Sequence, residues 1–111
     1  RSVYKWLIFF PLLPVYLAHP FGGEQENVDK VQAIILDLIH KHPDHTFYSP
    51  LHATGFMYSQ LTYLGGMEHC FEALGRCDAL WLCEGWQDSR GCNMEYGFAK
   101  GKGIPIKFIT G

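Results

Sequence analysis

The chain lacks the cysteine spacing that is typical of a metal or redox site. Its four cysteines, at positions 70, 77, 83 and 92, include no Cys-x-x-Cys pair. This absence argues against a zinc knuckle and against a thioredoxin-type motif. Cys77 and Cys83 flank or lie in an apolar segment, where a reduced and buried thiol is the ordinary state. We therefore expect a cytoplasmic protein.

The chain also carries little charge of either sign. Charged residues make up 18% of the 111 residues, and the formal net charge is -2. A nucleic-acid-binding domain would show a basic patch or stripe, so we expect no polymeric nucleic acid as a partner. The expected ligand is a small molecule. With 48% hydrophobic residues, the length fits one compact domain with an adequate core.

No apolar segment that we identify is long enough to cross a bilayer. Residues 6–13 are apolar but far too few, so we expect no membrane partner. They could pass for the core of a signal peptide, yet cleavage after Ala18 would destroy the first expected strand. We interpret residues 1–14 as an appended segment, either an extra edge strand or an arm that contacts a partner, and residues 15–111 as the domain.

Strand and helix patterns alternate along the domain. We expect strands at 15–18, 46–49, 79–83 and 104–109, helices at 24–41, 67–76 and 91–100, and a long irregular stretch at 51–66. This order predicts a three-layer α/β fold, flavodoxin-like or Rossmann-like, with a doubly wound parallel sheet of four to five strands. Right-handed crossovers then bring the loops that follow the strands to one side of the sheet.

An acidic residue, Glu95, follows the third expected strand across a polar, glycine-containing loop and lies near the first turn of a helix. Open α/β sheets bind ligands at such a place. The helix dipole there favours the ionised carboxylate, which suits a nucleophile or a general base. The alternative is that Glu95 only caps the helix or adds a favourable charge to its N-terminus.

The residues around Glu95 resemble the nucleoside 2-deoxyribosyltransferase-like superfamily. In that superfamily a strand and a polar loop lead to Gly-x-x-Met-Glu-x-Gly-x-Ala and then to Gly-x-x-Ile. The matching residues here, with small differences in spacing, are Gly91, Met94, Glu95, Gly97, Ala99, Gly103 and Ile106. Residues 76–79 and 85–86 look like the small uncharacterised phage and bacterial members. Residues 15–22 resemble the first strand and loop, with Tyr16 at the tyrosine position, and the resemblance extends to about residue 109.

The resemblance implies cleavage of the N-glycosidic bond of a 2′-deoxynucleoside or its 5′-phosphate, by hydrolysis or by transfer. A carboxylate attacks the anomeric carbon and forms a covalent sugar–enzyme intermediate, as in retaining glycosidases. By position Glu95 is the expected nucleophile. Tyr16 either orients Glu95 through its hydroxyl or simply packs as a strand residue. We expect no cofactor and no metal, and interpret His40, His42, His45 and His52 as a solvated surface.

The expected ligand contacts come from two loops. Ser89 stands where the nucleotide hydrolases of the superfamily carry a serine, so it is expected to bind a 5′-phosphate, to cap the helix, or to do both. Gly22 and Gly23 either present backbone N–H groups to an anion or only make a turn. The full set of expected ligand-binding residues is His19, Phe21, Gly22, Gly23, Trp86, Ser89, Gly91, Asn93 and Met94.

One position departs from the superfamily. Its members usually have an aspartate eight residues before the Asp of the third strand, placed to handle the leaving base, whereas this chain has Cys70. Glu68 and His69 are the neighbouring candidates to substitute. Without a substitute the leaving base has no proton donor, which would cost about 10²–10⁴ in rate. The alternative function is therefore a non-catalytic protein that binds or sequesters a nucleotide-derived small molecule.

Aromatic and apolar residues are concentrated in the second crossover, at Phe56, Met57, Tyr58, Leu61, Tyr63 and Leu64. Exposed apolar patches usually mark an interface, and a two-fold dimer is its commonest form, so we expect a homo-oligomer. The resemblance implies that residues 51–63 border a partner's pocket. The alternative is a lid over the chain's own sheet. Trp86, Phe56, Tyr58 and Tyr63 either stack on a base or belong to the core or an interface.

Overall fold

The computed structural model describes residues 12–110, and their elements alternate along the chain as the sequence indicates. The strands are β1 (Leu13–Ala18), β2 (His45–Tyr48), β3 (Ala79–Leu82) and β4 (Ile106–Phe108). The helices are α1 (Gln25–Lys41), α2 (Pro50–Thr54), α3 (Tyr63–Leu74) and α4 (Arg90–Lys102), with short 3-10 helices η2 (Gly55–Met57) and η3 (Trp86–Asp88).

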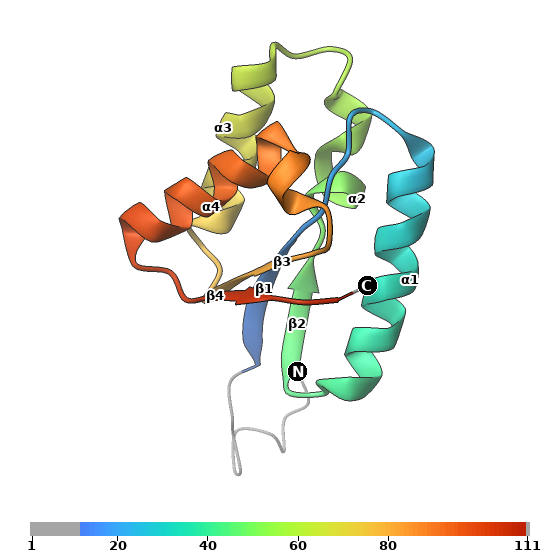
Figure 1. Ribbon diagram of the computed structural model, residues 1–111, viewed down its shortest axis with the longest axis vertical. Helices are drawn as coiled ribbons and strands as arrows, with labels where there is room; N and C mark the ends of the chain where they lie inside the picture. The colour runs from blue at the N-terminus through green and yellow to red at the C-terminus, as the bar shows by residue number, and fades with distance from the viewer. Residues whose placement is uncertain (1–11, 111) are drawn as a thin grey trace, which may run out of the picture.

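The four strands form one parallel sheet in the order β2-β1-β3-β4. Helix α1 covers one face, and α3 and α4 cover the other (Figure 1). This arrangement confirms the predicted three-layer, doubly wound α/β fold. The chain runs from β1 to β2 on one side and then crosses to β3 on the other side of β1. The strand order therefore reverses between β1 and β3, and their carboxyl ends border the crevice where open α/β sheets bind ligands.

Each face of the sheet has its own apolar core, and β1 contributes to both. Val15 and Leu17 pack with α1, whereas Tyr16 and Ala18 pack with residues of α3 and α4. All four residues of β3 are buried, which is typical of a strand covered on both faces. Strand alternation thus turns Tyr16 toward α4, the helix that carries Glu95.

The N-terminal boundary differs from the prediction. The expected appended segment, residues 1–14, lies mostly outside the described residues. Its last two residues, Leu13 and Pro14, begin β1 and pair with His45 and Thr46 of β2. Apart from the start of α3, other element ends differ from the expected ones by at most two residues, as for α4, which continues to Lys102.

The prediction of an irregular stretch at 51–66 is wrong. Pro50 is the first residue of α2, and the Ser49 side chain caps this helix by accepting a hydrogen bond from the His52 N–H. Thr62 caps α3 by accepting from the Gly65 N–H. Helix α3 therefore begins four residues earlier than expected, with Gly65 and Gly66 in its first turns. Glycine is a weak helix former, and this pair hid the start of the helix.

Among the described residues, no helix combines the length and the apolar composition that a bilayer crossing requires.

Candidate functional site

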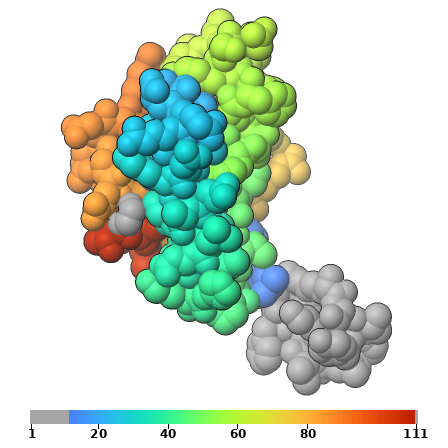
Figure 2. All heavy atoms as spheres, turned by 90° about the vertical axis from the view of Figure 1, so that its right-hand side faces the viewer, coloured from blue at the N-terminus to red at the C-terminus, as the bar shows by residue number. Residues whose placement is uncertain are grey.

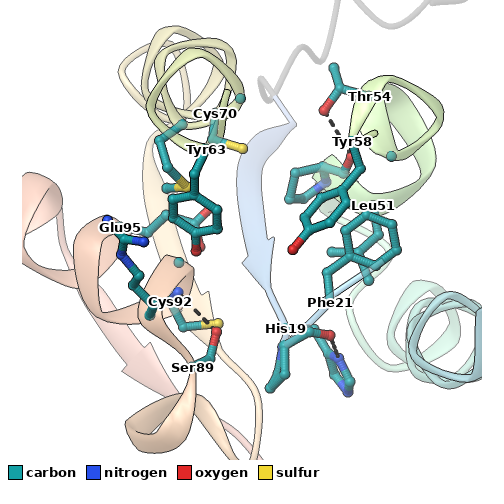
Figure 3. A pocket seen from close by; sticks show the side chains of 18 of the residues that line it. His19, Phe21, Leu51, Thr54, Tyr58, Tyr63, Cys70, Ser89, Cys92 and Glu95 are labelled. Carbon is teal, nitrogen blue, oxygen red and sulfur yellow. Dashed lines mark hydrogen bonds between the residues drawn. The ribbon is translucent and has the colours of Figure 1, made fainter. Parts of the chain in front are cut away.

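A cavity of about 710 Å³ opens at the carboxyl ends of β1 and β3. This volume is typical of small-molecule sites. One wall comes from the loop after β1, from α2 and from η2, and the other from α3 and the start of α4 (Figure 3). We call them the aromatic wall, which includes Phe21, Leu51 and Tyr58, and the acidic wall, which includes Tyr63, Cys70, Ser89 and Glu95.

Glu95 lies in the second turn of α4 and is only 5% exposed. Its Oε2 accepts a hydrogen bond from the Tyr16 hydroxyl. Burial raises the pKa of Glu95 from 4.5 to about 7, and the Tyr16 hydrogen bond opposes this rise. The other oxygen, Oε1, has no hydrogen-bond partner among the described residues. Every fully buried side-chain oxygen in those residues has a partner, so Oε1 is not fully buried. Oε1 therefore reaches the cavity that Glu95 lines.

Tyr16 is fully buried on β1, and burial raises the pKa of its hydroxyl well above the ordinary value. The charge of Glu95 is the next cause of this rise. Tyr16 is consequently a neutral donor that holds one carboxylate oxygen and cannot itself lose a proton at neutral pH. Both alternatives that the sequence left open for Tyr16 apply, since its ring is buried in the core and its hydroxyl contacts Glu95.

Cys70, the residue that departs from the resembled superfamily, lies in the same place. It belongs to α3 and lines the cavity. Burial raises the pKa of the Cys70 thiol, and the adjacent Tyr16 hydroxyl opposes part of this rise. A neutral thiol therefore stands beside Tyr16 and Glu95. We refer to Tyr16, Cys70 and Glu95 as the Glu95 cluster.

The start of α4 forms the polar end of the acidic wall. The Ser89 hydroxyl caps the helix by accepting from the Cys92 N–H at 3.2 Å, and it also lines the cavity. The Arg90 guanidinium carbon lies 4.4 Å from the centroid of the Tyr63 ring. A Cβ atom on Gly91 would lie 3.0 Å from the Tyr63 hydroxyl, so a larger residue there would displace Tyr63.

The loop after β1 shapes the aromatic wall. His19 is buried, its Nδ1 bonds the Pro20 carbonyl at 2.8 Å, and burial lowers its pKa. Gly22 and Gly23 have φ values of 60° and 77°, a backbone conformation that favours glycine. The Phe21 and Tyr58 rings meet edge to face with centroids 5.0 Å apart.

Most of the predicted ligand contacts line the cavity. They are His19, Phe21, Gly22, Ser89 and Gly91, and Glu95, the expected nucleophile, lines the cavity as well. Gly23 lies just outside the lining, where a Cβ atom would be 3.2 Å from the Tyr58 ring. Tyr16 lies behind Glu95, which it contacts.

Besides Gly23, three predicted contacts are absent from the lining. Trp86 stacks on Tyr96 and Phe108, with centroid distances of 5.1 and 5.4 Å. The Asn93 amide bonds the carbonyls of residues 86, 87 and 89 and so closes the turn at η3. On α4 the positions that line the cavity are 90, 91, 92 and 95, and Asn93 and Met94 are not among them.

Sequence reasoning missed Arg90 as part of the site. It is the only arginine or lysine that lines the cavity in the described part of the chain, and no described carboxylate pairs with it. The sequence signal that could have identified Arg90 is its position directly after Ser89, the residue that caps α4. Of the crossover aromatics, Tyr58 and Tyr63 line the cavity, whereas Phe56 is 80% exposed.

Of the four histidines that the sequence suggested as a solvated surface, His40 and His52 are exposed, whereas His42 and His45 are only half-exposed. His42 and His45 pack on the Trp81 ring, with centroids 5.0 and 5.4 Å away. His52 bonds the Ser49 hydroxyl at 2.7 Å. Within residues 12–110, no three potential metal ligands come together, and all four cysteines are free thiols.

Comparison with curated proteins gave no match. The family model of DUF4406, a domain of unknown function, matches residues 13–108. This range covers each strand and helix of residues 12–110 and the whole of the cavity described above. The chain therefore belongs to the DUF4406 family.

Proposed function

We propose that this protein cleaves the N-glycosidic bond of a nucleoside or nucleotide, as a hydrolase or a 2-deoxyribosyltransferase, with Glu95 as the nucleophile. The observation that carries the proposal is the state of Glu95. Its carboxyl group is almost completely buried, one oxygen is held by Tyr16, and the other reaches a cavity of small-molecule size.

Such a carboxylate is suited to attack carbon. Burial removes most of the water that would otherwise solvate the charge, and the Tyr16 hydrogen bond fixes the plane of the group. Attack of Oε1 on the anomeric carbon would form a glycosyl ester as the bond to the base breaks. Water or a second base would then take the sugar from Glu95.

The two walls suit the two ends of such a substrate. Phe21 and Tyr58 offer aromatic surfaces opposite the Glu95 cluster, as stacking on a planar base requires (Figure 3). Arg90, the Ser89 hydroxyl and the backbone of Gly91 gather at the first turn of α4. They support binding of an anionic group such as a 5′-phosphate.

The test is incubation with a panel of nucleosides, 2′-deoxynucleosides and their 5′-monophosphates, followed by chromatography for free base. Intact-protein mass spectrometry on quenched reactions should show a covalent sugar adduct. Glu95→Gln should abolish both signals, whereas Glu84→Gln, the same change at an exposed position outside the cavity, should abolish neither. Base release by Glu95→Gln at the wild-type rate would refute the assignment.

Binding without turnover is the second candidate function. One observation favours it: Glu95 is the only buried carboxyl group in the described part of the chain, so no second buried acid accompanies the nucleophile. The same panel distinguishes the two functions. A binding protein would retain an intact ligand through gel filtration and release no base.

We also propose that the protein is a cytoplasmic homodimer. The free state of all four cysteines supports a reducing compartment. Phe56 and Leu64 are 80% and 60% exposed, and they flank the residues that cover the cavity. Figure 2 shows this crossover segment at the upper end of the molecule, beside the loop that follows β1. The segment thus covers part of the cavity, as a lid would, and it leaves two large apolar side chains exposed for contact with a partner subunit.

A further inference from the structure

The polar side chains of the aromatic wall share a chemical character that bears on which ligand fits there. Five polar side chains of this wall line the cavity, namely His19, Glu24, Asn27, Thr54 and Tyr58. Figure 3 shows Thr54 and Tyr58 on the side of the cavity opposite Glu95. In the proposed function the base stacks on this wall, so these five groups determine which base edge is bound.

Three of the five side chains present only hydrogen-bond acceptors to a ligand. The Thr54 hydroxyl donates its one proton to the Pro50 carbonyl at 3.1 Å, which leaves the lone pairs of Oγ1. The Glu24 carboxylate has no proton to donate. The His19 Nδ1 must carry the ring proton because it bonds the Pro20 carbonyl, and burial lowers the pKa of the ring. The other ring nitrogen, Nε2, is therefore an unprotonated acceptor.

The Nε2 atom of His19 is open to a ligand. It has no hydrogen-bond partner among the described residues, whereas every fully buried side-chain nitrogen and oxygen there has one. Nε2 is therefore not fully buried, although His19 as a whole is only 8% exposed. Because His19 lines the cavity, it holds this acceptor at a nearly enclosed position of the wall.

The remaining two side chains can both accept and donate. The Asn27 amide nitrogen donates to the Phe21 carbonyl at 2.9 Å, which leaves the amide oxygen and a second N–H. The Tyr58 hydroxyl has one proton and two lone pairs. Pro20 and Pro50 also line the cavity, and proline has no backbone N–H to add. A donor on the ligand can thus bond to any of the five side chains, whereas an acceptor can bond to only two of them.

Glu24 places a negative charge beside the aromatic rings. Its backbone N–H bonds the Phe21 carbonyl at 3.1 Å, and the Phe21 ring contacts the Tyr58 ring. It is the only carboxylate among the described residues of this wall, and no lysine or arginine of those residues lines the wall. Carboxylates bond N–H groups more strongly than neutral acceptors do. The wall therefore favours a ligand that turns N–H groups toward it.

We propose that the site selects nucleosides or nucleotides whose base has an exocyclic amino group, as cytosine and adenine have, an inference that rests on the proposed function. Uracil and hypoxanthine have a carbonyl oxygen in that place. An amino group carries two N–H groups, and the carbonyl oxygen carries none. The adjacent ring nitrogen gains one hydrogen in the exchange, so the base edge loses one N–H in total. The carbonyl also brings lone pairs against a wall of acceptors, which loses hydrogen bonds to water without replacement.

The experiment compares bases that differ only by this exchange. The pairs are 2′-deoxycytidine with 2′-deoxyuridine and 2′-deoxyadenosine with 2′-deoxyinosine, each also as the 5′-monophosphate. Calorimetry in a Glu95→Gln background gives Kd, and chromatography with the wild type gives kcat/KM. The amino member of each pair should bind about tenfold or more tightly than its carbonyl counterpart.

Two substitutions test the wall itself. Glu24→Gln replaces a pure acceptor by an amide that also donates, and Thr54→Val removes the hydroxyl. Each should reduce the preference for the amino member about threefold or more. Glu26→Gln makes the same change at an exposed position of α1 outside the cavity, and Thr54→Ser keeps the hydroxyl. Both controls should retain the wild-type preference. Glu24 makes no side-chain cap on α1, so circular dichroism should show wild-type folding in Glu24→Gln.

Three outcomes would overturn the inference, and they are distinguishable. Equal or tighter binding of the carbonyl members, with cleavage of the panel intact, would end this inference and leave the proposed function standing. A wild-type preference that survives in both Glu24→Gln and Thr54→Val would show that the amino group bonds outside the aromatic wall. If the protein neither binds nor cleaves any member of the panel, the proposed function fails, and the inference fails with it.

Discussion

The Tyr16 hydroxyl donates a hydrogen bond to Glu95 across 79 positions of the sequence, and so joins the central strand β1 to helix α4. Both partners are buried, and the bond lies at the inner end of the cavity. Each partner affects the pKa of the other. The protonation of this pair therefore determines how activity and stability depend on pH.

We expect base release to rise with pH through about 7. The pKa of Glu95 is raised to about 7, so the carboxyl group is neutral below this value and ionised, hence nucleophilic, above it. The measurement is kcat/KM for base release between pH 5 and pH 9, a range set by roughly two units on either side of this value. A rate that is flat across this range would contradict the assignment of Glu95 as the group whose ionisation causes the rise.

Glu95→Gln should be more stable than the wild type at pH 8. The pKa of Glu95 is higher in the folded chain than in the unfolded one, so the wild type loses stability as pH rises from about 4.5 to about 7. The full shift corresponds to roughly 3 kcal/mol, which a neutral glutamine avoids. Urea unfolding at pH 4 and pH 8 measures this. Glu84→Gln, at an exposed site, should show no such gain.

Tyr16→Phe should shift the rise of activity with pH to higher pH values. The Tyr16 hydrogen bond lowers the pKa of Glu95, and its loss leaves burial unopposed. Activity at pH 7 should fall and recover in part at pH 9, about two units above the pKa of Glu95. Tyr48→Phe is the matched control, since the Tyr48 ring stacks on Tyr16 at 5.6 Å but its hydroxyl does not bond Glu95. An unshifted profile in Tyr16→Phe would show that the hydrogen bond does not tune the nucleophile.

Arg90→Met should weaken binding of a 5′-monophosphate more than binding of the corresponding nucleoside. The guanidinium group lies at the polar end of the cavity and has no carboxylate partner in the described part of the chain. A lost charge-assisted contact should cost about tenfold or more in Kd. Calorimetry with both ligands, in a Glu95→Gln background that prevents turnover, measures the difference.

Arg76→Met removes an exposed arginine that pairs with Glu72 outside the cavity, so it serves as the control. Equal affinity of the wild type for the nucleoside and its monophosphate would show that the site does not bind the phosphate.

Light scattering should give a dimer mass at micromolar protein concentration. Phe56→Ser should shift the equilibrium toward the monomer, because Phe56 is the most exposed large apolar side chain in the described part of the chain. Leu36→Ser, at an exposed position on α1, should leave the dimer intact. A monomer mass for the wild type at this concentration would end the dimer proposal and leave the crossover segment as a lid alone.

The sheet could be predicted from the sequence because strands and helices depend on local pattern, whereas the Tyr16–Glu95 contact joins residues 79 positions apart and was one of two alternatives for Tyr16 that the resemblance offered. Strand alternation and the loop before α4 bring both residues to the same edge of the sheet only because β1 pairs with β3. The resemblance placed Cys70 at the position where the structure completes the cluster. Asn93 and Met94 were predicted as ligand contacts but are absent from the lining, because only positions 90, 91, 92 and 95 of α4 line the cavity.

Other features depend on contacts between distant segments, which no local pattern reveals. Trp86 turns away from the cavity because Tyr96 and Phe108 provide aromatic surfaces on its other side. His42 and His45 are partly covered because Trp81 reaches them from the third strand. Arg90 enters the site only through the Tyr63 ring, which comes from a different helix.

The division of the cavity between two walls has a consequence for how a ligand acts on the whole chain. The aromatic wall comes from residues up to Tyr58 and the acidic wall from residues after it, and β1 and β3 pair beneath them. Neither half of the chain has a complete site, so a ligand recognises only the fully folded domain. Binding must therefore raise the free energy of unfolding by the amount that mass action requires. A rise in melting temperature would identify the natural ligand without any chemical turnover.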